Sequence, residues 1–246
     1  MSSFNPYAQS IWEAEQTYDV LPIDEFKEEI VRQIDENRVT IIQGETGCGK
    51  SSRVPLYLLE KEGTKFLVSQ PRRIACRGLL NRMRSTQVGR EHLFGMRLGG
   101  GIKDEVSGST RCFFCSAGYI VRLLAAYPGH FDDHTHLIID ECHERSVDGD
   151  VLCLLAKRLL LTNPSIKIVL MSATLEADRY RTYFGTLFNE VAPAKEEPAI
   201  DKVPLTAPAL TFGGGGVSEP IRIEVRKHKI STFFADDLEV RGNEMK

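Results

Sequence analysis

Residues 44–51 form a glycine-rich segment that reads GETGCGKS. Its spacing fits the pattern G-x-x-x-x-G-K-[ST], in which a loop between a strand and a helix binds phosphate groups. The glycines let the backbone wrap so that its amides and the start of the following helix face phosphate oxygens. Lys50 is then expected to neutralise the β- and γ-phosphates, and Ser51 to offer its hydroxyl to Mg²⁺, which prefers oxygen ligands. The candidate nucleotide-binding residues here are Gly44, Glu45, Thr46, Gly47, Cys48, Gly49, Lys50, Ser51 and Ser52.

A pair of carboxylates, Asp140 and Glu141, follows the apolar run at residues 136–139. Because that run is predicted to be a strand, both carboxylates should lie at the carboxyl edge of a sheet, where α/β folds bind ligands. We expect both to join Ser51 as candidate Mg²⁺ ligands, and Glu141 to orient and deprotonate the attacking water. An isolated Asp-Glu pair is more often a solvated strand end. Here, however, it follows a phosphate-binding loop and begins the tetrad DECH at 140–143.

The elements that must position these residues alternate between strand and helix patterns. Short β-branched and apolar runs predict strands, and apolar residues at helical spacing predict helices between them. This alternation favours an α/β fold with a mostly parallel central sheet covered by helices on both faces. The predicted strands are residues 39–43, 65–69, 110–115, 136–139 and 165–171, and the predicted helices are 24–37, 51–62, 74–84, 117–126 and 148–162.

Composition and charge restrict the class of protein. The chain has 246 residues, 42% of them hydrophobic and 26% charged, which suits one large globular domain with an appendage. Its formal net charge of -3 provides no overall basic field for nucleic acid, so such contacts need a local patch. Residues 71–100 supply one, with seven arginines against a single acidic residue.

The start of the chain has neither the basic nor the apolar region of a secretory signal, and no apolar run approaches the ~20 residues that span a bilayer. Six scattered cysteines are typical of reduced thiols in the cytoplasm or nucleus, so we expect an intracellular protein without disulfides or a membrane partner. Cys112 and Cys115 form a CxxC pair, but residues three apart on a strand face opposite sides, which disfavours zinc or redox use. His130, His134 and His136, with neighbouring aspartates, are better explained as a loop leading into a strand than as a metal site.

Five segments of the chain resemble, in order and spacing, motifs I, Ia, Ib, II and III of the DEAH/DExH helicases of superfamily 2. The resemblance extends over roughly residues 20–188 and implies a three-layer RecA-like P-loop NTPase domain. It also implies an ATP-dependent RNA helicase that uses ATP and Mg²⁺ and binds single-stranded or duplex RNA. The five segments are GETGCGKS at 44–51, SQPRRIA at 69–75, CSAGYIVRLL at 115–124, DECH at 140–143 and SAT at 172–174.

The same resemblance implies roles for individual residues. Arg82 matches the position at which the family stacks an arginine on adenine. Ser172 and Thr174 match residues that couple the nucleotide site to strand binding, with His143 bridging toward them. The implied catalytic residues are Lys50, Asp140, Glu141 and His143. The residues implied to grip the nucleic-acid backbone are Arg72, Arg73, Ser116 and Gly118, and arginines and helix-terminal amides do bind phosphates without reading sequence.

The organisation along the chain indicates half of a helicase motor. Residues 1–20 are expected to be an N-terminal extension and 21–190 the first RecA-like domain. Residues 191–220 hold five prolines and four consecutive glycines, which is typical of an insertion or linker. Residues 221–246 begin with an alternating run at 221–225 that predicts an edge strand, followed by a tail toward a second RecA-like domain. Neither that domain nor an arginine-finger motif is found in the sequence, so we expect a monomeric chain that binds adenine nucleotide weakly and is nearly inactive.

Two alternatives remain open at this level. Cys142 stands where the family name has alanine, and DECH also occurs in flavivirus-type helicases, although the other motifs favour the DEAH type. Ser116 stands where a threonine is usual and keeps the hydroxyl. The alternative from another class is a nucleotide-dependent interaction module that binds ATP or GTP without moving a strand. A GTPase is disfavoured because the sequence has no [NT]-K-x-D motif for guanine, and a transporter ATPase because it has no LSGGQ-like signature.

Overall fold

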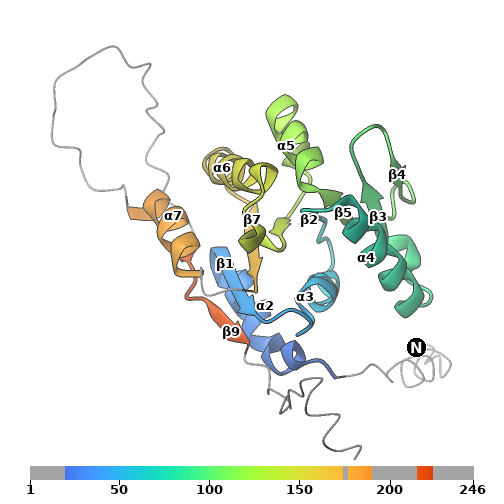
Figure 1. Ribbon diagram of the computed structural model, residues 1–246, viewed down its shortest axis with the longest axis horizontal. Helices are drawn as coiled ribbons and strands as arrows, with labels where there is room; N and C mark the ends of the chain where they lie inside the picture. The colour runs from blue at the N-terminus through green and yellow to red at the C-terminus, as the bar shows by residue number, and fades with distance from the viewer. Residues whose placement is uncertain (1–19, 174–176, 190–214, 224–246) are drawn as a thin grey trace, which may run out of the picture.

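The computed structural model describes residues 20–173, 177–189 and 215–223, which form a three-layer α/β domain (Figure 1). Its central sheet has the strand order β4-β3-β5-β2-β6-β7-β1-β8, and β9 also pairs with β1. The paired strands are parallel except for β3 with β4, so the predicted α/β fold with a mostly parallel sheet is confirmed. The strands are β1 (Asn37–Gly44), β2 (Phe66–Gln70), β3 (Phe94–Arg97), β4 (Lys103–Asp104), β5 (Cys112–Ser116), β6 (His136–Ile139), β7 (Lys167–Ser172), β8 (Gly215–Val217) and β9 (Ile221–Ile223).

Helices cover both faces of the sheet, with α2, α3 and α4 on one face and α5, α6 and α7 on the other (Figure 1). Successive strand residues point to opposite faces. Ile42 and Val68 therefore pack under the first set of helices, whereas Ile41 and Leu67 pack under the second. Because both faces are buried, the middle of these strands is mostly apolar. The helices are η1 (Pro22–Phe26), α2 (Lys27–Glu36), α3 (Lys50–Leu59), α4 (Arg73–Thr86), η2 (Glu91–Leu93), α5 (Ala117–Ala126), η3 (Pro128–Phe131), η4 (Cys142–Glu144), α6 (Val147–Thr162) and α7 (Ala177–Asn189).

The structure contains elements that the sequence did not predict. β3 and β4 form an antiparallel hairpin at one edge of the sheet, and α7 adds a helix to one face. The end of the expected linker also forms β8, which pairs with the first half of β1. β9, within the strand predicted at 221–225, pairs with the second half of β1, and residues 224–225 lie outside the described part. Strands this short are specified by pairing with a neighbouring backbone, so their side-chain pattern is too brief to reveal them.

The CxxC cysteines point to opposite faces of the sheet, whereas the rings of His130 and His134 lie close together, with centroids 5.2 Å apart. Cys112 and Cys115 belong to separate cores on opposite faces of β5, as predicted, and all six cysteines are free and buried. Within the described ranges, no three His, Cys, Asp or Glu side chains form a group that could hold a metal ion. The same ranges contain no helix with the length and apolarity needed to cross a membrane.

Two buried histidines, His134 just before β6 and His136 at its first position, are expected to make the stability of the domain dependent on pH. His134 and His136 are 3% and 5% exposed, and burial lowers the pKa of each to about 4. In the unfolded chain histidine titrates near 6.5. The unfolded state therefore binds protons that the folded state does not, and the free energy of unfolding falls as the pH drops from about 6.5 toward 4. We expect a loss of about 3 kcal/mol per histidine over that interval.

Urea unfolding of the chain at neutral pH and near pH 4 measures this loss. His136→Asn removes one titrating ring and should give a shallower decline of the unfolding free energy with acidification. His92→Asn, at an exposed position in η2, should keep the wild-type decline. An equal decline in all three proteins would show that the buried ring at position 136 does not contribute.

Candidate functional site

The phosphate-binding loop joins the end of β1 to the start of α3. Gly47 and Gly49 have φ angles of 89° and 107°, in the left-handed region that side chains avoid. A Cβ at Gly49 would also lie 2.8 Å from side-chain atoms of Leu21 and Ile23. The amide of Ile23 donates to the carbonyl oxygen of Cys48 at 3.2 Å, which fixes the loop from its outer side. The loop therefore wraps directly before the helical amides of α3, as phosphate binding requires.

Lys50 is the first residue of α3 and is only 4% exposed. Its ammonium donates hydrogen bonds to the carbonyl oxygens of Gly44 and Glu45, the second at 3.1 Å. Its Nζ also lies 3.7 Å from the Sγ of Cys48. The loop's own backbone thus holds the positive charge beside the glycines. A phosphate oxygen would be a stronger partner than these carbonyls, because it carries a negative charge that attracts the ammonium.

Asp140 directly follows β6 and is 3% exposed. Its Oδ1 accepts from the amide of Glu141 at 2.9 Å, and its Oδ2 accepts from Nε2 of Gln70 at 2.6 Å. The hydroxyl of Ser51 is a third donor to this carboxylate. Burial raises the pKa of Asp140, while the hydrogen bonds from Ser51 and Gln70 act in the opposite direction. The fold therefore brings two of the three predicted magnesium ligands into direct contact.

Glu141 adopts a left-handed backbone conformation with φ 51°. This conformation costs a non-glycine residue about 1–3 kcal/mol and is concentrated at functional sites. Burial, followed by the charge of Asp140, raises the pKa of Glu141 above its usual value. A carboxylate with a raised pKa is a better proton acceptor, which suits the role predicted for Glu141.

His143 lies between the carboxylate pair and the end of β7. Its Nδ1 accepts from the amide of Ala173 at 3.2 Å and lies 3.4 Å from Oε2 of Glu141. A ring nitrogen that accepts an amide proton carries no proton itself. In that tautomer the proton is on Nε2, so the approach of Glu141 is not a salt bridge. His143 thus contacts the SAT segment beside Ser172, which is 0% exposed, while Thr174 lies outside the described residues.

A hollow of ≈ 230 Å³, here called the nucleotide hollow, joins these elements. Thr46 and Lys50 from the loop and α3, Glu141 from the end of β6 and Arg82 from α4 all line it. Gly47, Gly49, Ser51 and Ser52 line it as well. A larger hollow of ≈ 420 Å³ between α5 and α6 contains none of the predicted site residues. The groups suited to phosphate binding therefore converge on the smaller hollow.

A further hollow of ≈ 510 Å³, here called the arginine hollow, is lined by three of the predicted RNA-binding residues, Arg73, Ser116 and Gly118. α4 begins at Arg73 and α5 begins directly after Ser116, so two helix N-termini lie here. Helix N-termini attract anions through their free amides and dipoles. Arg122 of α5 adds a further positive side chain, and Asp148 of α6 an acidic one.

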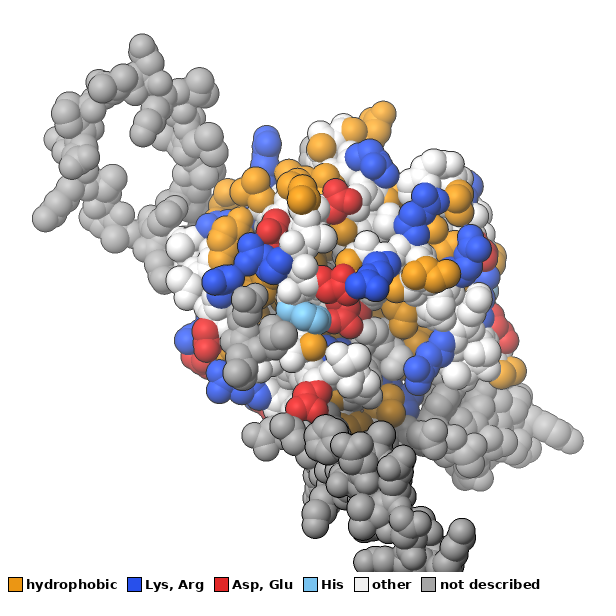
Figure 2. Space-filling view, in the orientation of Figure 1, with side chains coloured by type: hydrophobic (Ala, Val, Ile, Leu, Met, Phe, Trp, Pro, Cys, Tyr) orange, Lys and Arg blue, Asp and Glu red, His pale blue; other side chains and the backbone are white. Residues whose placement is uncertain are grey.

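Arg72 is not brought into the arginine hollow. Its guanidinium pairs with Glu144 at 3.4 Å, and 71% of its side chain is exposed. Exposed ion pairs of this kind contribute little stability, so Arg72 can exchange its partner for another anion. Figure 2 shows Lys and Arg side chains around a central acidic group, in line with local basic patches on an otherwise mixed surface.

Two residues at the site had no role predicted from the sequence. Gln70 ends β2, is 2% exposed and donates to Asp140, so it links the SQPRRIA segment to the carboxylate pair. Its one sequence signal is a polar residue at the end of an apolar strand. Tyr180 of α7 donates its hydroxyl to the carbonyl oxygen of Cys142 at 2.6 Å and so holds η4. No local pattern could reveal that contact, because it joins residues 38 positions apart.

A wrapped glycine loop, a buried lysine and paired carboxylates after a parallel strand define a nucleotide-binding P-loop domain. Residues 24–182 match the family model described as DEAD/DEAH box helicase. The chain therefore belongs to the DEAD/DEAH box helicase family, and the resemblance found in its motifs is confirmed.

Individual relatives agree with this family. The chain is 35% identical over 231 residues to the probable ATP-dependent RNA helicase spindle-E of Anopheles gambiae, covering 89% of this chain and 14% of that protein. It is 37% identical over 176 residues to the DExH-box ATP-dependent RNA helicase DExH2 of Arabidopsis thaliana, covering 67% of this chain and 11% of that protein. It is also similar to the crystal structure of the E. coli DExH-box NTPase HrpB, with a TM-score of 0.63, 26% identity, and coverage of 70% of this chain and 21% of that one. The fold is thus RecA-like, and the chain spans a small part of the length of its relatives.

Proposed function

We propose that this chain is the ATP-binding half of an ATP-dependent RNA helicase that couples ATP hydrolysis to RNA binding and unwinding or remodelling. The main support for this proposal is that four residues, Lys50, Ser51, Asp140 and Glu141, lie together at the carboxyl edge of the sheet. The arginine hollow beside it offers helix N-termini to a phosphate backbone. Relatives named ATP-dependent RNA helicases support RNA as the strand.

The donor set at the nucleotide hollow suits a magnesium nucleotide. Ser51 and Asp140 share a hydrogen bond and Glu141 adjoins them, and hydroxyl and carboxylate oxygens are the ligands that Mg²⁺ prefers alongside substrate phosphates. When bound, Mg²⁺ supplies positive charge that offsets the charge of the phosphates. Lys50 then contacts the β- and γ-phosphates, Arg82 stacks on the adenine, and Glu141 accepts a proton from the attacking water.

Two short links connect this chemistry to the strand-binding side. Gln70 is bonded to Asp140 and is followed after two residues by Arg73, so a shift of Asp140 is transmitted to the start of α4. His143 contacts Ala173, so a shift of the carboxylate pair is also transmitted to the end of β7. The first link reaches the arginine hollow through Arg73, so it couples the occupancy of the nucleotide hollow to the shape of the arginine hollow. The second link reaches the SAT segment instead.

We assign residues 21–190 to the first RecA-like domain, 1–20 to an N-terminal extension and 191–220 to an insertion that ends in β8. Residues 221–246 lead toward a second RecA-like domain, which supplies arginine fingers and closes the site. The chain alone is then a monomer with little activity. Coverage of only 11% and 14% of two relatives and the free state of all six cysteines support a larger protein of the cytoplasm or nucleus.

RNA stimulation of ATP turnover distinguishes a motor from a nucleotide-dependent interaction module. In the protein that joins this domain to its second RecA-like domain, single-stranded RNA should raise the rate of ATP hydrolysis. The isolated 246-residue chain should show little hydrolysis with or without RNA. A flat response of the larger protein would favour the interaction module. Strong RNA-stimulated turnover by the isolated chain would contradict the need for a second domain.

A further inference from the structure

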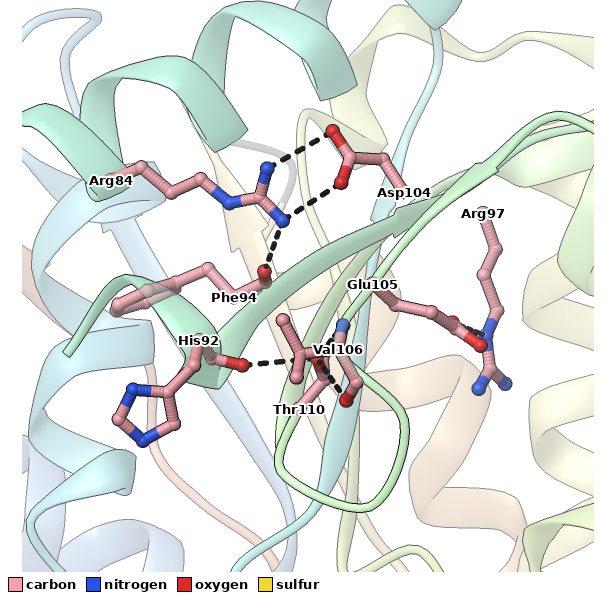
Figure 3. Close-up of polar contacts among 8 residues, drawn as sticks. All are labelled: Arg84, His92, Phe94, Arg97, Asp104, Glu105, Val106 and Thr110. Carbon is pink, nitrogen blue, oxygen red and sulfur yellow. Dashed lines mark hydrogen bonds and ion pairs between the residues drawn. The ribbon is translucent and has the colours of Figure 1, made fainter.

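The β3–β4 hairpin presents a glycine tip from a firmly bonded base. Arg84 of α4 donates two hydrogen bonds of 3.0 Å to the carboxylate of Asp104 and one of 3.0 Å to a backbone carbonyl of β3 (Figure 3). The tip closes where the amide of Leu98 donates to the carbonyl oxygen of Ile102 at 2.8 Å. Residues 99–101 between them are all glycine, so the tip exposes backbone rather than side chains.

Residues on both sides of the glycine tip are also fixed by side-chain contacts. Arg97 pairs with Glu105 at 2.5 Å (Figure 3). Its guanidinium also lies 4.1 Å from the centroid of the Phe113 ring. The hydroxyl oxygen of Thr110 accepts from the amide of Val106 at 3.0 Å. These bonds fix the hairpin before any ligand arrives, which reduces the entropy that binding must overcome.

A hollow of ≈ 600 Å³, here called the hairpin groove, lies between the hairpin tip and α5. Two apolar side chains stand at its surface, Ile102 with 40% and Tyr127 with 70% of its area exposed. Tyr119 and Leu123 of α5 add apolar surface between them. Large apolar side chains grouped in a hollow at the surface are typical of a ligand or partner site.

The charge of the hairpin groove suits an anionic ligand. Glu105 is already paired with Arg97, so the groove has a net positive lining. Its backbone at residues 99–100 and the side chain of Arg122 also line the arginine hollow, so the two hollows are continuous. A Cβ at Gly99 would collide with the guanidinium of Arg122, which therefore lies against the tip where the hollows meet. The basic residues that line the groove are Arg97, Lys103 and Arg122.

We propose that the hairpin groove binds a nucleobase of a single strand whose phosphates occupy the arginine hollow. Tyr127 provides an exposed ring for stacking and Ile102 an apolar wall, while Arg122 meets the phosphate that connects the two hollows. Stacking on an aromatic ring tolerates any base, so this contact adds affinity without sequence preference. A peptide without acidic side chains is disfavoured as the occupant, because the basic rim continues into two helix N-termini, which attract anions. The inference deepens the proposed function and rests on it.

Single-strand binding by the 246-residue chain tests the inference. The probes are an oligouridylate of ~12 nucleotides and a strand of equal length built from abasic ribose units, which keeps the phosphates and removes the bases. Tyr127→Ala should weaken binding of the oligouridylate about fivefold or more and leave binding of the abasic strand unchanged. Tyr127→Phe should retain wild-type affinity. Leu154→Ala removes another exposed apolar side chain, 59% exposed on α6, and should bind both strands like the wild type.

Arg73→Ala separates the inference from the proposed function, because it should weaken binding of both strands by removing a phosphate contact. If Arg73→Ala weakens both strands and Tyr127→Ala weakens neither, the base site is wrong and the phosphate site stands. Equal weakening of both strands by Tyr127→Ala also overturns the base site. If the wild-type chain binds neither strand, the proposed RNA site itself fails.

Discussion

Replacing Glu141 with glutamine is expected to lower ATP turnover about 100- to 10,000-fold, the usual contribution of a general base, while ATP remains bound. Glutamine keeps the size and hydrogen-bonding reach of the side chain but cannot accept the proton of the attacking water. Because glutamine has the same shape as glutamate, the substitution should not add to the strain of the left-handed backbone at this position, with φ 51°. Steady-state ATPase of the two-domain protein with RNA, together with nucleotide titration, measures both effects.

The matched control for this variant is Glu144→Gln. Glu144 lies in the adjoining η4 but pairs with Arg72 and does not line the nucleotide hollow, so turnover should stay close to that of the wild type. The wild-type ATPase rate should also fall as the pH is lowered, because only the ionised carboxylate of Glu141 accepts a proton. Burial raises the pKa of Glu141, so this fall should begin at a higher pH than for an exposed glutamate. Unchanged turnover of Glu141→Gln would exclude this residue as the base.

Replacing Gln70 with alanine is expected to lower turnover about 10- to 100-fold, from the loss of a hydrogen bond to a charged group. The variant removes the 2.6 Å bond to Oδ2 of Asp140 and leaves a buried carboxylate with fewer donors. Because the bond from Gln70 lowers the pKa of Asp140, its loss should raise that pKa. More Mg²⁺ should then be needed for half-maximal ATPase activity, and the difference should grow as the pH falls.

Gln43→Ala is the control for the loss of a buried amide. Gln43 lies near the end of β1, is 8% exposed, and has an Oε1 atom without a hydrogen-bond partner among the described residues. Its removal should leave the Mg²⁺ requirement of the ATPase unchanged. A Gln70→Ala protein with normal Mg²⁺ dependence and reduced thermal stability would show that Gln70 has only a structural role.

Local sequence was sufficient to predict the α/β class, the phosphate-binding loop and the acidic strand end. A G-x-x-x-x-G-K-S segment predicts a phosphate-binding loop wherever a strand precedes it and a helix follows it, because its glycines and lysine act within one turn of the chain. The buried strands were equally apparent, since both of their faces require apolar side chains. The candidate RNA-binding residues were proposed from the resemblance alone. The structure places Arg73, Ser116 and Gly118 in one hollow but pairs Arg72 with Glu144.

The contacts between residues far apart in the sequence, which bring the site together, became apparent only in the tertiary structure. Gln70 meets Asp140 across 70 positions because β2 and β6 are neighbours in the sheet, and no property of either segment specifies that pairing in advance. β4 and β8 have only two and three residues, too few to show a side-chain period, and they form because pairing with a neighbouring strand satisfies their backbone hydrogen bonds. The hairpin groove exists only where that hairpin and α5 lie side by side. Short-range chemistry is encoded in adjacent residues, whereas hollows and long-range bonds depend on which strands become neighbours when the chain folds.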